Sequence, residues 1–393
     1  MVFLFFIHSN RFLIVILTYN FPTKIRFGAG AVEELADYLK DNNLSKPLIV
    51  TDPVVAQLPF LKRIAENLNA KGISVEVFSD IHKNPVKSDV YKGDEAFHAT
   101  ERDSIIGIGG GAAMDVARAI VLRINHREDL FKYDDLIGGD IYVTNDVPHF
   151  ITIPTTSGTG SEVGRSAIIA DDETHQKKIL FSPKLLAKIV FADPLLTLDL
   201  PPFVTAATGM DALTHNMEAF LAKMYHPICD GIALEGISLI HRSLEKAVNN
   251  PADLEARSKM LLGSMMGAIA FQKGLGVVHS LAHPLSSLLD THHGLANAIN
   301  LPYGMRFNMA GFEAKFRRIA QTLDLKEETG EAVVNYLFDL NSRVNIPHRL
   351  RDIGVRDEHI ETLADLAIAD FAHPNNPKPV SRADFKALYL EAL

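Results

Sequence analysis

The chain has 393 residues, of which 47% are hydrophobic, and a formal net charge of −9 at pH 7. This length and composition suffice for two or three domains with full cores, and the lack of a basic stripe argues against a nucleic-acid partner. The single cysteine, Cys229, excludes an internal disulfide and a cysteine-based metal cluster, and it fits a reducing cytoplasm.

The N-terminal segment Met1–Leu17 reads MVFLFFIHSNRFLIVIL, two apolar runs separated by four other residues. It is too short to span a bilayer, which takes roughly 20 apolar residues. It also lacks the charged start, single apolar run and small-residue cleavage site of a secretory signal. We interpret residues 1–17 as an N-terminal extension. No other segment is long and apolar enough to span, so we expect a cytoplasmic protein without a membrane partner.

Segments typical of strands alternate with segments typical of helices from residue 18 to about residue 200. The expected strands are Tyr19–Phe27, Pro47–Thr51, Ser74–Phe78, Ser104–Ile108, Phe150–Ile153, Ser166–Ala170 and Ile189–Ala192. The expected helices are Ala31–Asn42, Phe60–Ala70, Val90–Arg102 and Ala112–Ile124. Such alternation indicates a parallel sheet with helices on both faces. Residues 18–200 are therefore predicted to form an α/β domain.

After Pro201-Pro202 the pattern is helical throughout, and alternation typical of strands is nearly absent. The expected helices are Val204–Lys223, Pro227–Asn249, Ala252–Phe271, Val277–Leu289, Gly294–Phe307, Ala314–Leu323, Glu331–Leu340, Asp357–Ala367 and one last helix after the loop Asn375–Pro379. Residues 201–393 are therefore predicted to form a second, all-helical domain, with the boundary near Leu200.

A glycine-rich loop, Gly107-Ile-Gly109-Gly110-Gly111-Ala-Ala-Met-Asp115, follows an expected strand and opens an expected helix. Adjacent glycines let a phosphate approach the backbone, and a helix N-terminus supplies free N–H groups and the positive end of the helix dipole. The loop differs from the dinucleotide fingerprint, in which an acidic residue follows about 20 residues later, because the strand-end acid Asp52 lies upstream. A plain tight turn is the alternative.

A threonine-rich turn, Pro154-Thr155-Thr156-Ser157-Gly158-Thr159-Gly160-Ser161-Glu162, follows another expected strand. Its hydroxyl groups suit a phosphate or an amide of a ligand. A solvated loop is the alternative, but its position after a strand, like that of the glycine-rich loop, favours a binding role.

The helical part contains one aspartate and several histidines at spacings that suit a metal site. Asp211 and His215 are four residues apart and so share one helix face. Further along the chain, a segment of fifteen residues contains four more histidines, His279, His283, His292 and His293. A lone histidine pair is often capped or solvated, but the whole set favours a metal. Three imidazoles and one carboxylate suit Fe(II), Zn(II), Co(II) or Ni(II) rather than Ca(II).

Together these motifs resemble the iron-containing (group III) alcohol dehydrogenases, from about Tyr19 to Leu393. The matching motifs are Lys24-Ile-Arg-Phe-Gly28-Ala-Gly30-Ala, Gly109-Gly-Gly-x-x-x-Asp115, Pro154–Glu162, Ala207-Thr-Gly-Met-Asp211-Ala-Leu-Thr-His215, Gly274–His279 with His283-Pro284, and His293-Gly-Leu-Ala-Asn297-Ala. The resemblance implies a Rossmann-like, dehydroquinate synthase-like α/β domain followed by an all-α domain. It also implies hydride transfer between a metal-bound primary alcohol, or its aldehyde, and NAD, in a homo-oligomer of two or more chains.

The resemblance further implies roles for single residues. The ligands of Fe²⁺, or of Zn²⁺ in its place, are Asp211, His215, His279 and His293; His283 is then a nearby base and His292 a bystander. The residues implied for NAD are Asp52, Asn84, Gly109, Gly110, Gly111, Thr155, Thr156, Thr159 and Lys177. Asp52 would bind the adenosine ribose and repel a 2′-phosphate, which favours NAD over NADP.

Two cations, Arg165 and Lys273, are expected to flank the substrate site, where they would pair with a carboxylate. A short hydroxy acid such as 4-hydroxybutyrate is then a better substrate than a plain primary alcohol. If both side chains are solvated or paired with acids such as Glu162, the enzyme is a general alcohol dehydrogenase.

Three rival functions are those of a glycerol dehydrogenase-like enzyme, a dehydroquinate synthase-type enzyme and a non-enzymatic metal-binding protein. For the first, one aspartate and two histidines would suffice as ligands. The complete set of one aspartate and three histidines argues against the synthase. The glycine-rich loop and the threonine-rich turn argue against a protein that only binds metal.

Overall fold

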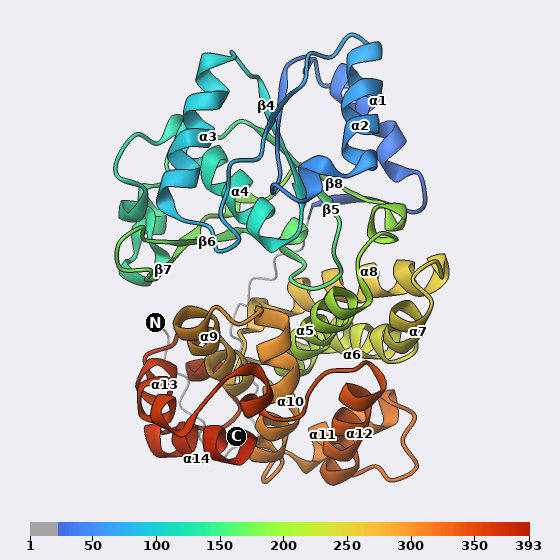
Figure 1. The fold of residues 1–393 in the computed structure, drawn as a ribbon, viewed down its shortest axis with the longest axis vertical. Helices are drawn as coiled ribbons and strands as arrows, with labels where there is room; N and C mark the ends of the chain where they lie inside the picture. Colours follow the sequence, from blue (N-terminus) through green and yellow to red (C-terminus); the bar gives the residue numbers. More distant parts are fainter. Residues whose placement is uncertain (1–22) are drawn as a thin grey trace, which may run out of the picture.

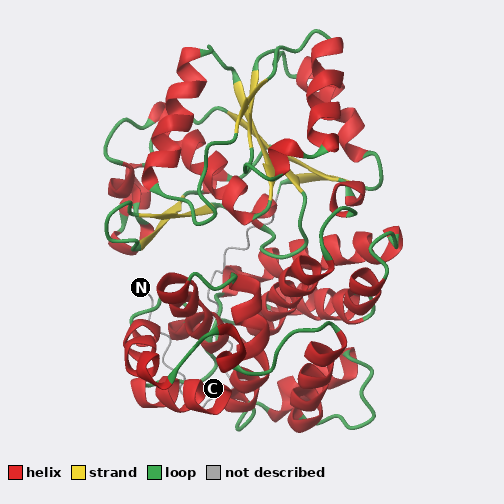
Figure 2. Cartoon of the chain, in the orientation of Figure 1, coloured by secondary structure: helices red, strands yellow, loops and turns green. Residues whose placement is uncertain are grey.

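The computed structural model describes residues 23–393, so the extension predicted for residues 1–17 lies outside the described residues. The described chain forms an α/β half, drawn in the upper part of Figure 1, and a helical half below it. Within the described residues the strands are confined to the first half, as Figure 2 shows.

Six parallel strands form the central sheet, in the order β1-β8-β5-β4-β2-β3. They are β1 (Lys24–Phe27), β2 (Pro47–Val50), β3 (Glu76–Phe78), β4 (Ser104–Gly109), β5 (His149–Pro154) and β8 (Ile189–Ala192). The central strands β2, β4 and β8 are buried along their whole length, as expected for the continuous apolar runs of a parallel sheet that is covered on both faces. The predicted parallel sheet is confirmed.

Helices cover both faces of this sheet. They are α1 (Leu35–Asp41), which follows the short turn Ala31–Glu34, α2 (Pro59–Ala70), α3 (Lys87–Ala99) and α4 (Gly111–Asn125). Because successive strand residues point to opposite faces, Leu48 packs in one core with α3 and α4, whereas Ile49 packs in the other with α1 and α2. Each face of the sheet thus has its own apolar core.

A separate hairpin lies beside α4. It consists of β6 (Ser166–Ala170) and β7 (Lys177–Phe181), which pair antiparallel and form their own two-stranded sheet. The sequence predicted β6 but missed β7, which begins with two lysines. Leu180 of β7 nevertheless joins the core on the α3 and α4 face, and this tertiary packing explains why the segment is a strand.

The helical half is built around α5 (Pro202–Leu221), which is buried almost completely from Thr205 onward. The other helices are α6 (Pro227–His241), α7 (Leu244–Asn249), α8 (Leu254–Ala270), α9 (Val277–Leu289), α10 (His293–Asn308), α11 (Glu313–Thr322), α12 (Gly330–Arg343), α13 (Ile360–Ile368) and α14 (Arg382–Ala392). The single helix predicted for Pro227–Asn249 is therefore two helices. The domain boundary near residue 200 stays a prediction.

No single helix in the described part of the chain is long and apolar enough to cross a membrane. The segments Leu254–Lys273 and Val277–Leu289 meet the length and composition test only as a pair, and they are bent by 107° relative to each other. Most of their residues are buried inside the helical half.

Candidate active site

One aspartate and three histidines converge from three helices. Asp211 and His215 lie on successive turns of α5, His279 lies in the first turn of α9, and His293 is the first residue of α10. Oδ1 of Asp211 is 3.9 Å from Nε2 of His215, 3.9 Å from Nε2 of His279 and 3.6 Å from Nε2 of His293. The donor atoms of Asp211, His215 and His279 all lie within 4.8 Å of one another, which suits donors that surround one ion at roughly 2.1 Å each. His293 approaches this group at Asp211.

The protonation states of this cluster also suit a divalent cation. Burial lowers the pKa of His279 and of His293 well below the ordinary value, so both imidazoles are neutral near pH 7. Burial by itself would raise the pKa of Asp211, but His215, His293 and His279 together lower it to about 2. The cluster therefore offers an ionised carboxylate and neutral imidazoles, which are the forms that bind metals.

Asn297, on the second turn of α10, lies among the same donor atoms. Its Nδ2 is 2.7 Å from Oδ1 of Asp211, 3.1 Å from Nε2 of His293 and 3.3 Å from Nε2 of His279. The amide thus contacts three of the four side chains. The sequence contained this residue in a motif but did not single it out as part of the site.

His283 lies one helical turn after His279 and is held by a carboxylate that the sequence did not reveal. Its Nδ1 is 2.7 Å from Oδ2 of Asp370, in the segment after α13. Asp370 also accepts hydrogen bonds from Oγ of Ser280 and from the backbone N–H of Ala372. Burial by itself would raise the pKa of Asp370, but His283 and these hydrogen bonds lower it to about 2. The ionised carboxylate favours a proton on Nδ1 of His283 and leaves the lone pair on Nε2.

The ring of His283 also faces the metal cluster. It stacks on the ring of His293, with 5.3 Å between centroids and 14° between planes. The ring of His283 also stacks on the ring of Phe371, with 5.3 Å between centroids. His292, by contrast, caps α10 by accepting a hydrogen bond from the backbone N–H of Leu295.

The glycine-rich loop lies where the order of the sheet reverses. From β2 the chain passes to β3 on one side and then to β4 on the other, and ligands of open α/β sheets bind at the carboxyl ends of strands at such a point. Asp52 follows β2, and Gly109 ends β4 with a φ of +145°. A Cβ on Gly109 would lie 3.4 Å from Oδ2 of Asp52 and 2.7 Å from Cβ of Ala113.

The threonine-rich turn packs against this loop. The backbone N–H of Thr155 donates to the carbonyl of Gly109 at 3.0 Å. A Cβ on Gly110 would lie 3.3 Å from Cγ2 of Thr156. A Cβ on Gly111 would lie 3.0 Å from Cγ2 of Thr159. The glycine-rich loop and the threonine-rich turn, which are separate motifs in the sequence, therefore form one continuous surface at the N-terminus of α4.

The same turn contacts α8 and α5, and α5 carries two residues of the metal cluster. Oγ of Ser264, in α8, donates to the carbonyl of Gly158 at 3.1 Å. A Cβ on Gly158 would lie 2.8 Å from Cβ of Thr208, one helical turn before Asp211 on α5. The glycine-rich surface and the metal cluster are thus joined through a close-packed contact.

Two further predicted cofactor residues lie between the halves. Lys177, at the start of β7, is near enough to His293 for its charge to lower the pKa of that imidazole, and burial lowers its own pKa. Nδ2 of Asn84 donates to Oδ1 of Asp290 at 2.6 Å, just beyond α9. Asn84 therefore contacts the helical half directly.

The prediction that Lys273 flanks the substrate site is wrong. Its side chain is buried within the helical half, where Nζ pairs with Asp230 and donates to the carbonyl of Phe220 near the end of α5. A buried ammonium requires such partners. Because they satisfy Nζ of Lys273, this group is not available to bind a substrate carboxylate. Arg165 is half-buried, with its guanidinium 5.6 Å from the ring centroid of Phe181. Among the described residues it forms no ion pair, with Glu162 or with any other acid.

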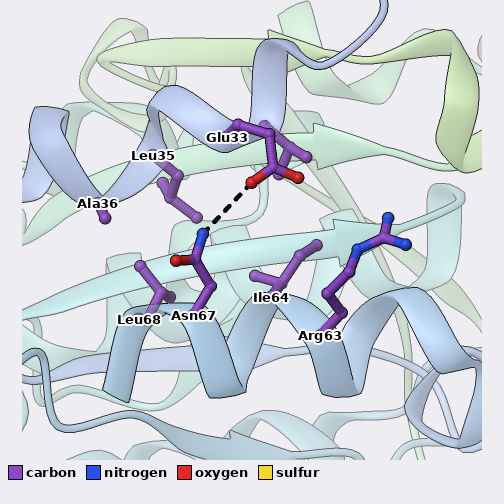
Figure 3. A pocket seen from close by; sticks show the side chains of 8 residues that line it. Glu33, Leu35, Ala36, Arg63, Ile64, Asn67 and Leu68 are labelled. Carbon is purple, nitrogen blue, oxygen red and sulfur yellow. Dashed lines mark hydrogen bonds between the residues drawn. The ribbon is translucent and has the colours of Figure 1, made fainter. Parts of the chain in front are cut away.

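Figure 3 shows a different pocket, with a volume of only about 10 Å³, between the start of the α1 segment and α2. Its polar lining residues are Arg63, Glu33 and Asn67, and Nδ2 of Asn67 donates to Oε2 of Glu33 at 3.3 Å. None of the predicted site residues lines it.

Two family models together match almost the entire described chain. The model of "Iron-containing alcohol dehydrogenase" matches residues 22–194, and that of "Fe-containing alcohol dehydrogenase family, C-terminal" matches residues 205–393. The chain belongs to the iron-containing alcohol dehydrogenase family. It is therefore a metal-dependent, NAD-linked alcohol dehydrogenase that acts on a small alcohol or aldehyde, as the sequence predicted.

Individual relatives of this family match over nearly their full length. The 4-hydroxybutyrate dehydrogenase of Cupriavidus necator is 36% identical over 380 residues, covering 94% of this chain and 98% of the relative. The crystal structure of a 1,3-propanediol oxidoreductase has a TM-score of 0.92 at 32% identity, covering 96% of this chain and 100% of the other. The sulfoacetaldehyde reductase of Bifidobacterium kashiwanohense, solved in complex with NAD+, has a TM-score of 0.87 at 26% identity, covering 96% and 99%.

Proposed function

We propose that Asp211, His215, His279 and His293 hold the catalytic metal of this alcohol dehydrogenase. The observation that carries the proposal is the approach of three imidazole Nε2 atoms to within 3.6–3.9 Å of one carboxylate oxygen. The neutral imidazoles and the ionised carboxylate support it. Iron is the metal that the family name indicates, and zinc suits the same donors.

We propose that NAD lies along the glycine-rich loop and the threonine-rich turn. Gly109, Gly110 and Gly111 leave the backbone open to the pyrophosphate, and the N-terminus of α4 supplies N–H groups to it. The hydroxyl groups of the turn add donors beside it. Asp52, at the end of β2, would bind the adenosine ribose. The contacts of this turn with α5 and α8 would bring the nicotinamide end toward the metal cluster.

When bound, the metal acts as a Lewis acid that lowers the pKa of the alcohol hydroxyl, and NAD is the hydride acceptor. The chain's own residues then handle the proton and the alignment. Nε2 of His283 accepts the hydroxyl proton directly or through water, since Asp370 keeps Nδ1 protonated. Asn84 and Lys177 border the nicotinamide end. This role of His283 is part of the proposal.

The substrate that we propose is a short hydroxy acid such as 4-hydroxybutyrate. Arg165 supports this choice, because it is a half-buried cation that pairs with no acid among the described residues, and a guanidinium binds a carboxylate in a bidentate way. The relative from Cupriavidus necator, a 4-hydroxybutyrate dehydrogenase, supports the same class. With Lys273 engaged elsewhere, Arg165 alone would bind the carboxylate.

A comparison of kcat/KM on 4-hydroxybutyrate and on 1-butanol tests this choice. We expect the native enzyme to prefer the hydroxy acid and Arg165→Ala to lose most of that preference, since butanol has no carboxylate and serves as the internal control. A preference for butanol, or an unchanged preference in Arg165→Ala, would leave a general alcohol dehydrogenase.

We also propose that the enzyme is a cytoplasmic homo-oligomer without nucleic-acid or membrane partners. The net charge of −9 supports the lack of a nucleic-acid partner, and the single cysteine supports a reducing cytoplasm. The homo-oligomer rests on the family to which the chain belongs. Sedimentation of the purified protein tests the oligomeric state, and a monomer at micromolar concentration would contradict it.

A further inference from the structure

A second carboxylate on α5 contacts a proposed metal ligand from behind. Glu218 lies seven residues after Asp211, so Asp211, His215 and Glu218 share one face of the helix. Its side chain is 1% exposed. Oε2 of Glu218 is 2.6 Å from Nδ1 of His279, the ring nitrogen opposite the Nε2 that faces Asp211.

The same carboxylate also binds the N-terminus of α9. The backbone N–H of Val278 donates to Oε1 of Glu218 at 2.7 Å, and that of His279 donates to Oε2 at 3.3 Å. A Cβ on Gly276 would lie 2.9 Å from Oε1, so glycine at this position leaves the room that the carboxylate needs. Glu218 therefore fixes both the backbone and the ring of His279.

This contact favours the tautomer of His279 that carries its proton on Nδ1. A carboxylate beside Nδ1 accepts its hydrogen and leaves the lone pair on Nε2, on the side of Asp211 and His293. By contrast, Nδ1 of His215 has no hydrogen-bond partner among the described residues. Among these two ligands, only His279 has its orientation fixed by a carboxylate.

We propose that Glu218 is a positioning residue of the metal site. It does not bind the metal, but it holds the Nε2 lone pair of His279 toward the ion and so raises the affinity for metal. Partners of this kind typically contribute 10- to 100-fold in metal affinity. The inference rests on the proposed role of His279 as a ligand.

The test measures Zn²⁺ affinity of the full-length, metal-stripped protein by competition with a chromophoric chelator. We expect Glu218→Gln to bind Zn²⁺ about 10- to 100-fold more weakly, while far-ultraviolet circular dichroism stays native. Asp94→Asn is the matched control, because Asp94 is a buried carboxylate of α3 in the other half of the molecule. Its Zn²⁺ affinity is expected to equal that of the native protein.

A double-mutant cycle separates positioning from a general effect on the fold. In a His279→Ala background, Glu218→Gln is expected to weaken Zn²⁺ binding little further, because the ring that Glu218 positions is gone. An equal loss in both backgrounds, or native affinity in Glu218→Gln alone, would overturn the inference. Native affinity in His279→Ala would instead overturn the proposed ligand set.

Discussion

Oδ2 of Asp370 lies 2.7 Å from Nδ1 of His283, although 87 positions separate the two residues in the chain. The segment after α13 thus returns to the metal cluster and brings an ionised carboxylate to a histidine that already stacks on His293. Like Glu218 beside His279, Asp370 supports a ring without facing the metal donors. The site therefore depends on residues from both ends of the helical half.

The first prediction concerns this histidine. His283→Gln is expected to keep its metal and to lower kcat by about 100-fold, since a positioned acid or base typically contributes at least that much. Asp370→Asn is expected to lower kcat by less, because the ring of His283 remains. Metal content and steady-state rates measured on the same samples check both. Loss of metal from His283→Gln would make it a ligand instead.

The second prediction concerns the choice of cofactor. Native enzyme is expected to use NAD with higher kcat/KM than NADP, because the charge of Asp52 would repel a 2′-phosphate. Asp52→Asn removes that charge, while its side-chain oxygen can still accept the hydrogen bonds that Oδ1 accepts from Val54 and Val55 at 2.9 Å. The ratio of the two efficiencies is therefore expected to fall. Equal kcat/KM with NAD and with NADP in the native enzyme would contradict the proposed role of Asp52.

The third prediction concerns the contact between the two halves. In Gly158→Ala the new methyl group would lie 2.8 Å from Cβ of Thr208. We expect a loss of about 1–3 kcal/mol in the free energy of unfolding and a higher KM for NAD, because the threonine-rich turn must move away from α5. Gly231→Ala is the control, since no atom lies within 4 Å of its Cβ position. Equal behaviour of the two variants would contradict the close contact.

The fourth prediction concerns the pH dependence of stability in metal-stripped protein. Burial lowers the pKa of His279 and His293 well below the ordinary value, whereas the unfolded chain binds protons at about pH 6.5. Below that pH these two histidines bind more protons in the unfolded than in the folded state, so their contribution to stability falls as the pH is lowered. Each histidine contributes up to about 1.4 kcal/mol per pH unit.

Denaturant unfolding between pH 7.5 and pH 5.5 measures this effect. Burial raises the pKa of Glu162 and of Glu218 to about 7, so these carboxyls titrate over the same range with the opposite sign. The informative quantity is therefore the difference between native protein and His279→Asn. The variant is expected to show the shallower dependence. A variant as steep as the native protein would contradict the assignment of a buried, neutral His279.

The features that the sequence predicted well are those that leave a local pattern. Continuous apolar runs such as Pro47–Val50 mark buried parallel strands, and the apolar period of Val277–Leu289 gave the bounds of α9. Asp211 and His215 were recognisable because four residues make just over one helical turn. The motifs of the family then supplied the remaining candidate ligands.

The features that it missed depend on contacts between distant segments. Nothing near Asp370 or Glu218 in the chain shows that each lies beside a histidine of α9. The strand β7 begins with lysines, and its packing of Leu180 against α4 is a tertiary effect. Lys273 was misplaced for the same reason, because its spacing from His279 carries no information about the carboxylate of Asp230.

The most direct test of the central claim measures bound metal and NADH formation together, on protein purified without oxygen. We predict that chelation removes a divalent metal and the activity in parallel, that Fe²⁺ or Zn²⁺ restores the activity, and that Asp211→Ala lacks both. Full turnover in metal-stripped protein, or full metal occupancy and rate in Asp211→Ala, would contradict the account.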